Sequence, residues 1–234
     1  MASFTLDWLH IVVLLGAVQG VFLAGALATK RRNRTANRLL AALMLAFSIL
    51  LASTVYQAAG FVPRFPHFFG VAYPLPFLYG PLFYLYAVSA ADRTRSLSPR
   101  DALHLLPFLA TAVAGLPIYL MGGPEKVAFY QGLLNGERPL LLQIADPLKM
   151  VSGVTYTIIT VLFLRRHRVR VKESYSSIER VNLRWLLWLG ASGTAVWFLA
   201  VTLDVLRSAG IARIERADDF VALAAPHRQR LATA

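Results

Sequence analysis

Long apolar stretches that alternate with clusters of basic residues constrain this 234-residue sequence more than any other feature. The first stretch is residues 8–29, and others cover residues 39–59, 99–121 and 183–206. A helix of roughly 20 residues is long enough to cross the hydrocarbon core of a bilayer. Because 57% of the chain is hydrophobic and its mean hydropathy is +0.55, the sequence predicts an all-α, polytopic membrane protein.

The basic residues gather in three alternate connections between the apolar stretches. Lys and Arg number five in residues 30–38, three in residues 93–100 and seven in residues 165–184, which is 15 of the 24 in the chain. Cytoplasmic loops carry such an excess. The clusters adjoin the ends of apolar stretches and lack interleaved aromatic residues, which favours topogenic charge over contact with nucleic acid. The pattern predicts a multi-pass protein of the bacterial cytoplasmic (inner) membrane, with its N-terminus outside.

Residues 71–86, VAYPLPFLYGPLFYLY, are apolar enough for a bilayer but contain three prolines. In a helix, Pro74, Pro76 and Pro81 would each remove a backbone donor and leave one carbonyl without its usual partner. Lipid supplies no replacement, so other protein groups, water or a ligand must satisfy that backbone. We expect the three prolines and Gly80 to form a hinge, or an outward-facing cup, above a regular helix.

The segment 98–101, Ser-Pro-Arg-Asp, has the composition of a helix start. Ser98 can cap the helix, proline suits the first helical position, and Asp101 can return a hydrogen bond to the capping residue. We therefore expect a helix from Pro99 to about Met121. Asp101 and His104 lie three residues apart, and we expect them to face each other as a structural pair.

The connection over residues 122–144 is rich in glycine and proline, and its middle, KVAFYQGLL, is expected to form a short interfacial helix. Asp146 followed by Pro147 repeats the cap-then-proline signal and predicts that a fifth helix runs from there to about Leu164. Lys149 lies one turn from Asp146. Either the two form a functional ion pair near the outer boundary, or Lys149 extends to the interface without such a role.

Small residues recur at every fourth position in the first apolar stretch, at Gly16, Gly20 and Ala24. Such a stripe lets another helix backbone come close, either within the bundle or in a homodimer. Contact within the chain is the favoured interpretation, since the motif is common in membrane helices.

The last part of the sequence predicts a sixth helix and the beginning of a seventh. Ser176 and Glu179 form a second capping box before a helix that leaves the bilayer near Leu206. Residues 220–225, FVALAA, would begin a seventh helix, but residues 226–234 are too polar to complete a crossing. We therefore expect six transmembrane helices plus a truncated seventh in one membrane domain over residues 1–225. Residues 226–234 would be an aberrant or truncated tail of a longer protein.

Three segments carry a resemblance to a known family: GPLFYLY at residues 80–86, LHLLPF at residues 103–108 and SYSSIERVNLRWLLWL at residues 174–189. Together with the order of apolar runs and basic loops over residues 5–225, they resemble the membrane-embedded N-terminal region of bacterial multipass transcriptional regulators with an AraC-type helix-turn-helix domain. The resemblance implies a seven-helix sensor that delivers a DNA-binding domain to the cytoplasm. A related arrangement of membrane helices forms the sensor domain of some histidine kinases. No such effector domain is present in this sequence, so the resemblance implies contact with DNA only through a part absent here.

Enzymatic chemistry is not indicated. The chain has no cysteine, and its five histidines show no paired or HExxH spacing, so we expect no metal and no cofactor. It also lacks a GxSxG motif and a phosphate-binding loop. The middles of the apolar stretches hold almost no ionisable residues, and no internal repeat of the kind that builds transporters is visible.

The preferred hypothesis is a signal-input domain that senses a small molecule, a lipid or the state of the envelope. A signal must favour one arrangement of helices over another to be transmitted. The expected ligand-binding residues at the outer end of the bundle are His67, Tyr73, Phe77, Tyr79, Asp146, Lys149 and Asp204. A kinked aromatic core without a ligand is the alternative for this cluster. For the whole chain, the alternatives are a small transporter or channel component and a structural anchor or dimerisation module.

Overall fold

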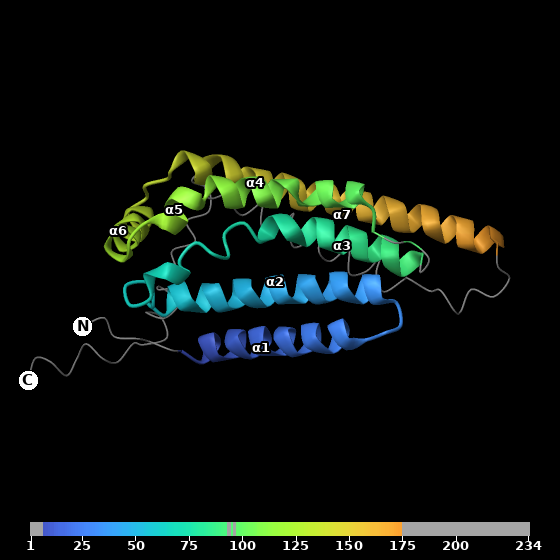
Figure 1. Ribbon diagram of the computed structural model, residues 1–234, viewed down its shortest axis with the longest axis horizontal. Coiled ribbons are helices and arrows are strands. Elements are labelled where there is room, and N and C mark those ends of the chain that lie inside the picture. Colours follow the sequence, from blue (N-terminus) through green and yellow to red (C-terminus); the bar gives the residue numbers. More distant parts are fainter. Residues whose placement is uncertain (1–6, 93–94, 96, 175–234) are drawn as a thin grey trace, which may run out of the picture. The chain divides into compact units, whose positions relative to one another are not determined.

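A computed structural model describes residues 7–92, 95 and 97–174, all of which belong to one compact unit of the chain (Figure 1). Within these residues the secondary structure is helical and contains no strand, which confirms the all-α prediction. The expected sixth and seventh helices, the capping box at Ser176 and Glu179, and the tail lie outside the described residues.

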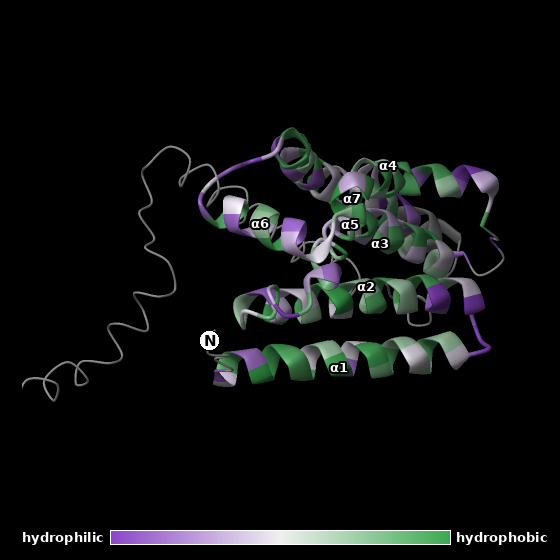
Figure 2. Ribbon diagram, turned by 60° about the vertical axis from the view of Figure 1, so that its left-hand side comes forward, coloured by the Kyte–Doolittle hydropathy of each residue, from purple (hydrophilic) through white to green (hydrophobic). Residues whose placement is uncertain are grey.

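Helices α1 (Trp8–Thr29) and α2 (Arg34–Ala58) form an antiparallel hairpin and lie side by side (Figures 1 and 2). The stripe of small residues faces α2 of the same chain. A Cβ atom at Gly20 would overlap the hydroxyl of Ser48, and one at Gly16 would lie 3.7 Å from Leu51 Cδ1. Ala24 is buried in the same interface. The small residues thus allow the two backbones to approach closely within one chain.

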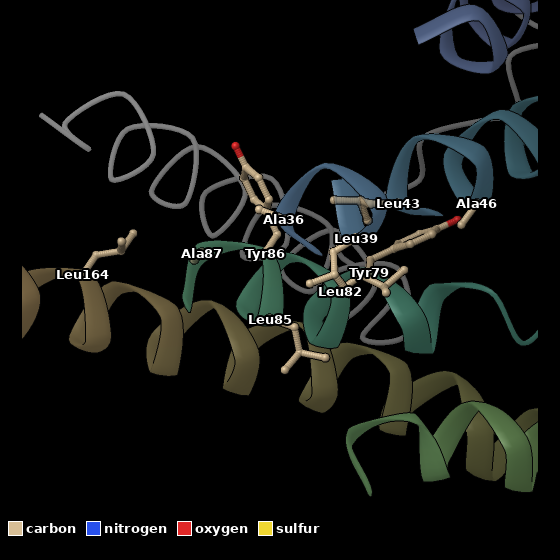
Figure 3. Close-up of a cluster of buried hydrophobic side chains, with 10 residues drawn as sticks. All are labelled: Ala36, Leu39, Leu43, Ala46, Tyr79, Leu82, Leu85, Tyr86, Ala87 and Leu164. Carbon is tan, nitrogen blue, oxygen red and sulfur yellow. The ribbon is translucent and has the colours of Figure 1, made fainter. Parts of the chain in front are cut away.

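Helix α3 (Pro76–Ala91) follows a single 3₁₀ turn, η1 (Pro66–Phe68), and contacts both α2 and α7 (Leu140–Ser174). The main hydrophobic core lies along these contacts (Figure 3). Its buried members are Ala36, Leu39, Leu43, Ala46, Tyr79, Leu82, Leu85, Tyr86, Ala87 and Leu164. Gly80 permits the contact with α7, because a Cβ atom there would lie 2.6 Å from Tyr156 Cβ.

The predicted helix start at Pro99 is confirmed, and the predicted single helix to residue 121 is wrong. The chain forms the 3₁₀ helix η2 (Pro99–Leu105), then α4 (Leu106–Ala114) and α5 (Leu116–Leu120). The break between α4 and α5 has a local cause: Pro117 has no N–H to donate to the carbonyl four residues earlier.

The short helix expected between residues 122 and 144 is present as α6 (Gly123–Leu134), whereas the expected start of the next helix is wrong. Helix α7 begins at Leu140, so Pro147 lies inside it rather than at its first position. The carbonyl of Pro139 accepts the N–H groups of Leu142 and Gln143 at 2.9 and 3.2 Å. These hydrogen bonds form the first turn of α7, which therefore begins six residues before the expected start at Asp146. The helix also continues past Leu164 through the basic residues, since Arg and Lys are good helix formers.

Among the described residues, three helices are long and apolar enough to cross a membrane: Trp8–Thr29, Arg34–Ala58 and Leu140–His167. The ribbon of α1 is mostly hydrophobic along its length (Figure 2). Large apolar side chains of this helix are exposed, with Trp8 and Phe22 each 75% exposed. Such a surface is compatible with contact with lipid. Helix α3 has 16 residues, about 24 Å at 1.5 Å each, and is shorter than the usual span.

Candidate functional site

A cavity of about 390 Å³ lies where the C-terminal end of α2, the segment before α3, and helices α5, α6 and α7 meet. Its volume is within the range of ligand-binding pockets. The lining residues are Leu50, Ser53, Thr54, Gln57, Phe69, Gly70, Ala72, Tyr73, Pro76, Gly115, Ile118, Tyr119, Phe129, Tyr130, Leu133, Leu134, Leu141, Leu142 and Lys149.

The proline-rich segment forms one wall of this cavity as a series of turns. Gly70 has a φ of 85°, a conformation that side-chain-bearing residues rarely adopt. The Gly70 carbonyl accepts the N–H of Tyr73 at 3.0 Å and the hydroxyl of Tyr119 at 3.4 Å, and the Ala72 carbonyl accepts the N–H of Leu75 at 3.1 Å. Two of the three carbonyls that we expect to lose a helical partner, those of Gly70 and Ala72, are therefore satisfied by other protein groups.

The prolines themselves occupy three different settings. Pro74 lies in the turn that precedes α3, Pro76 is the first residue of α3, and Pro81 lies inside the helix. Proline at the first position costs no hydrogen bond, because that N–H has no helical partner in any case. The helix thus begins where the proline-rich segment ends, and only Pro81 interrupts its hydrogen-bond pattern.

Three polar side chains from two segments meet at the edge of the cavity. The Tyr73 hydroxyl donates to Asp146 Oδ1 at 2.9 Å, and Lys149 Nζ donates to the same oxygen at 3.0 Å. Lys149 Nζ also lies 3.1 Å from the centroid of the Tyr73 ring, a cation–π contact. This group, hereafter the Tyr73–Asp146–Lys149 cluster, ties α7 to the segment before α3.

Helix α6 closes the cavity through aromatic contacts and a buried lysine. Phe69 packs against Phe129 and Tyr130, with ring centroids 6.2 and 5.3 Å apart. Lys126 is only 2% exposed, and its Nζ donates to the Tyr119 carbonyl at 2.9 Å. The lysine thereby holds α6 against the end of α5, so that both helices contribute to the wall.

The structure brings some of the expected ligand-binding residues together and separates others. Tyr73 and Lys149 line the cavity, and Asp146 binds both at its edge. Phe77 is 3% exposed and buried in the protein interior, and it does not line the cavity.

Tyr79 is also buried away from the cavity. Its ring stacks on Phe47 at 4.2 Å, and its hydroxyl has no hydrogen-bond partner among the described residues. His67 lies in η1 and does not line the cavity either. Asp204 lies outside the described residues.

Sequence reasoning missed the polar residues that α2 and α5 contribute. Ser53 and Gln57 lie one helical turn apart on α2, and the Gln57 amide donates to the Ser53 hydroxyl at 3.3 Å. Polar residues spaced four apart near the end of an apolar stretch are a signal that could have identified this face. Tyr119 could not have been identified in this way, because its place depends on the break between α4 and α5.

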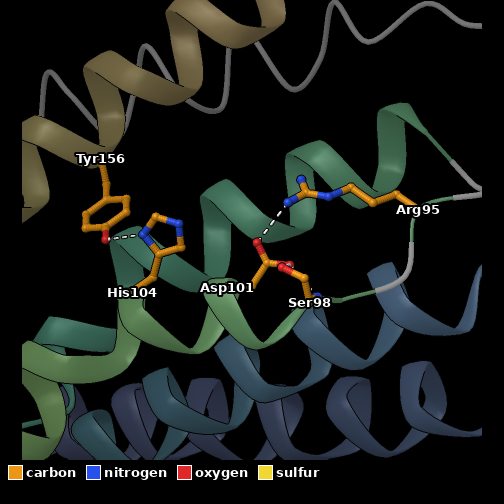
Figure 4. Close-up of polar contacts among 5 residues, drawn as sticks. All are labelled: Arg95, Ser98, Asp101, His104 and Tyr156. Atoms are coloured by element: carbon orange, nitrogen blue, oxygen red, sulfur yellow. Dashed lines mark hydrogen bonds and ion pairs between the residues drawn. The ribbon is translucent and has the colours of Figure 1, made fainter.

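A second polar region joins η2 to the connection that follows α3 and to α7 (Figure 4). The Asp101 carboxylate accepts the Ser98 N–H at 2.8 Å and forms an ion pair with Arg95 at 2.8 Å. His104 Nδ1 instead contacts the Tyr156 hydroxyl at 2.8 Å, so the expected Asp101–His104 pair is replaced by separate partners.

The described part of the chain contains no group of three His, Asp or Glu side chains that could hold a metal. The cavity is mostly apolar and is lined by one charged side chain, an arrangement suited to binding a small molecule. We found no match to this chain among protein-family models, curated proteins or solved structures.

Proposed function

We propose that this chain is the membrane-embedded input region of a bacterial one-component transcriptional regulator and that its cavity receives the signal molecule. The observation that supports this most directly is the cavity of about 390 Å³, with the Tyr73–Asp146–Lys149 cluster at its edge. The resemblance of residues 80–86 and 103–108 to such regulators suggests the output. Contact with DNA would belong to a cytoplasmic effector domain of the helix-turn-helix kind.

A ligand in the cavity would act on the arrangement of helices because five segments meet there. Binding can shift an equilibrium only by its difference in affinity for two states. The segment before α3 forms one wall, and α3 runs from it along α7 to the region of His104 and Tyr156. Repacking of that wall would change how α3 lies on α7, with Pro74, Pro76, Gly80 and Pro81 as the hinge.

The test uses a regulator that carries this region ahead of its DNA-binding domain. Tyr73→Phe removes the hydroxyl from the cluster and Asp146→Asn removes the carboxylate. Both should change the transcriptional response to the signal, measured with a reporter gene at equal protein levels in the membrane. His67→Asn, which lies outside the cavity, is the matched control. An unchanged response in both cluster variants would remove the cavity from the signalling mechanism.

The proposed topology has six transmembrane helices and part of a seventh, with the N-terminus outside. Among the described residues, helix α3 and the segment η2–α4–α5 are the proposed crossings that lack a continuous long helix. The chain contains no cysteine, so a single introduced thiol reports its own location. A membrane-impermeant maleimide added to whole cells should label the Phe65→Cys variant and leave the Arg32→Cys variant unlabelled. The reverse pattern would show that the topology is the opposite of the one proposed.

A further inference from the structure

The cavity contains one charged residue among the side chains that line it. Most of its wall is apolar or aromatic, with Leu50, Leu133 and Leu142 from three different helices. Lys149 is the charged exception, and its side chain is 11% exposed. A ligand that fills this space therefore meets a mostly apolar surface, neutral polar groups such as those of Ser53 and Gln57, and a single ammonium group.

The Lys149 ammonium is held in place with one donor to spare. An ammonium has three N–H donors. One bonds Asp146 Oδ1 at 3.0 Å, and the contact with the Tyr73 ring, 3.1 Å to the centroid, accounts for a second. The third is available on the side of the cavity that Lys149 lines. Asp146 does not line the cavity, and the oxygen that binds Lys149 already accepts the Tyr73 hydroxyl.

The size of the cavity limits the ligand. One water molecule occupies about 30 Å³ in the liquid. If each non-hydrogen atom of a ligand takes the same volume, the cavity of about 390 Å³ holds on the order of a dozen such atoms. The one available N–H donor of Lys149 suits a carboxylate, because a carboxylate needs fewer hydrogen-bond donors around it than a phosphate group does. A cationic headgroup would be placed beside the ammonium, at an electrostatic cost.

We propose that the cavity binds a medium-chain carboxylate, with its headgroup on Lys149 and its alkyl chain between α2, α5 and α6. The proposal rests on the proposed function and names the chemical class of its ligand. Asp146 and the Tyr73 ring are positioning groups that fix the ammonium. The hydrocarbon part of the ligand would lie against Leu50, Leu133 and the neighbouring aromatic rings.

The experiment uses three photoreactive probes that share a ten-carbon chain and differ in the headgroup: decanoate, decanol and decylamine, each with a diazirine near the chain end. The purified full chain in nanodiscs is irradiated with each probe, and the labelled peptides are identified by mass spectrometry. The decanoate probe should label residues 115–142 most strongly, and unlabelled decanoate should compete. Lys149→Met should reduce that labelling about tenfold, the effect of losing a hydrogen bond to a charged group.

Two variants control for nonspecific and folding effects. Lys149→Arg keeps the charge and should retain most of the labelling. Lys30→Met removes an exposed lysine outside the cavity and should leave labelling unchanged. Equal labelling by all three probes, or preference for decylamine, would overturn the carboxylate proposal while leaving the cavity as a ligand site. Absence of cavity labelling by every probe would overturn both this proposal and the proposed function.

Discussion

Helix α2 takes part in two regions that are built in opposite ways. Toward α1 it presents Ser48 and Ala41 to Gly20 and Ala24, and the two helices touch through small side chains. At its C-terminal end it presents Ser53 and other polar residues to a cavity of about 390 Å³. One helix thus has a tightly packed interface along one side and an open chamber at one end.

The difference follows from the side chains that meet in each region. Small residues at every fourth position let two helical backbones approach closely. Their atoms are then in van der Waals contact, and no space remains for a ligand. At the other region, aromatic rings, prolines and a break between α4 and α5 keep the backbones apart. A hollow forms there because rigid side chains and turns cannot close it. The α1–α2 interface should therefore be sensitive to added volume, and the cavity should not.

The largest effect is expected from Gly20→Leu, which adds volume where a Cβ atom would already overlap Ser48. Overpacking of this kind costs about 1–3 kcal/mol and occasionally more. Unfolding of the purified protein, followed by helical circular dichroism during SDS titration, measures the loss. Gly25→Leu is the matched control on the same helix, because no described atom lies within 4 Å of a Cβ atom there. Equal stability of the two variants would contradict close contact at Gly20.

A smaller effect is expected from Asp146→Asn, which leaves the Lys149 ammonium without a carboxylate. Lys149 is mostly buried, so loss of this charged hydrogen bond should cost about 1–2 kcal/mol in the same unfolding assay. The double variant Asp146→Asn/Lys149→Met should recover much of that loss, since it removes the unpaired charge. Additive effects of the two single variants would show that the side chains do not interact.

The smallest effect on stability is expected from Leu133→Phe, which extends a side chain into the cavity. The free energy of unfolding should change by less than about 0.5 kcal/mol or increase, because the added ring occupies existing space. Leu43→Phe adds the same atoms to the filled core and should destabilise the protein by about 1–3 kcal/mol. Similar losses in both variants would mean that the space near Leu133 is not open.

Local sequence signals predicted much of the architecture. The capping residues identified the helix start at Pro99, and apolar length identified α1 and α2. The one-turn spacing of Asp146 and Lys149 left two alternatives, an ion pair or extension of Lys149 to the interface, and the structure contains the ion pair. These features depend on residues close together in the chain, where propensity and periodicity carry the information.

Other features depend on contacts between distant residues. Pro147 was read as a helix start, but α7 begins earlier because the Pro139 carbonyl organises its first turn. Phe77 and Tyr79 were expected in the ligand site and are buried elsewhere, since the turns before α3 set which of its faces meets the cavity. The contribution of α6 to the wall depends on Lys126 and the Tyr119 carbonyl, a contact that no local pattern indicates.

The most direct test of the central claim, that the end of α2 faces an open chamber while its α1 side is closed, compares two thiols. The chain has no cysteine, so Ser53→Cys and Ser48→Cys each introduce one reactive group of nearly the same size as the serine it replaces. Both proteins are treated with a small methanethiosulfonate reagent in nanodiscs, and the rate of modification is measured by mass spectrometry. We expect rapid modification at position 53 and none at position 48 while the protein remains folded. Equal rates at the two positions would contradict the central claim.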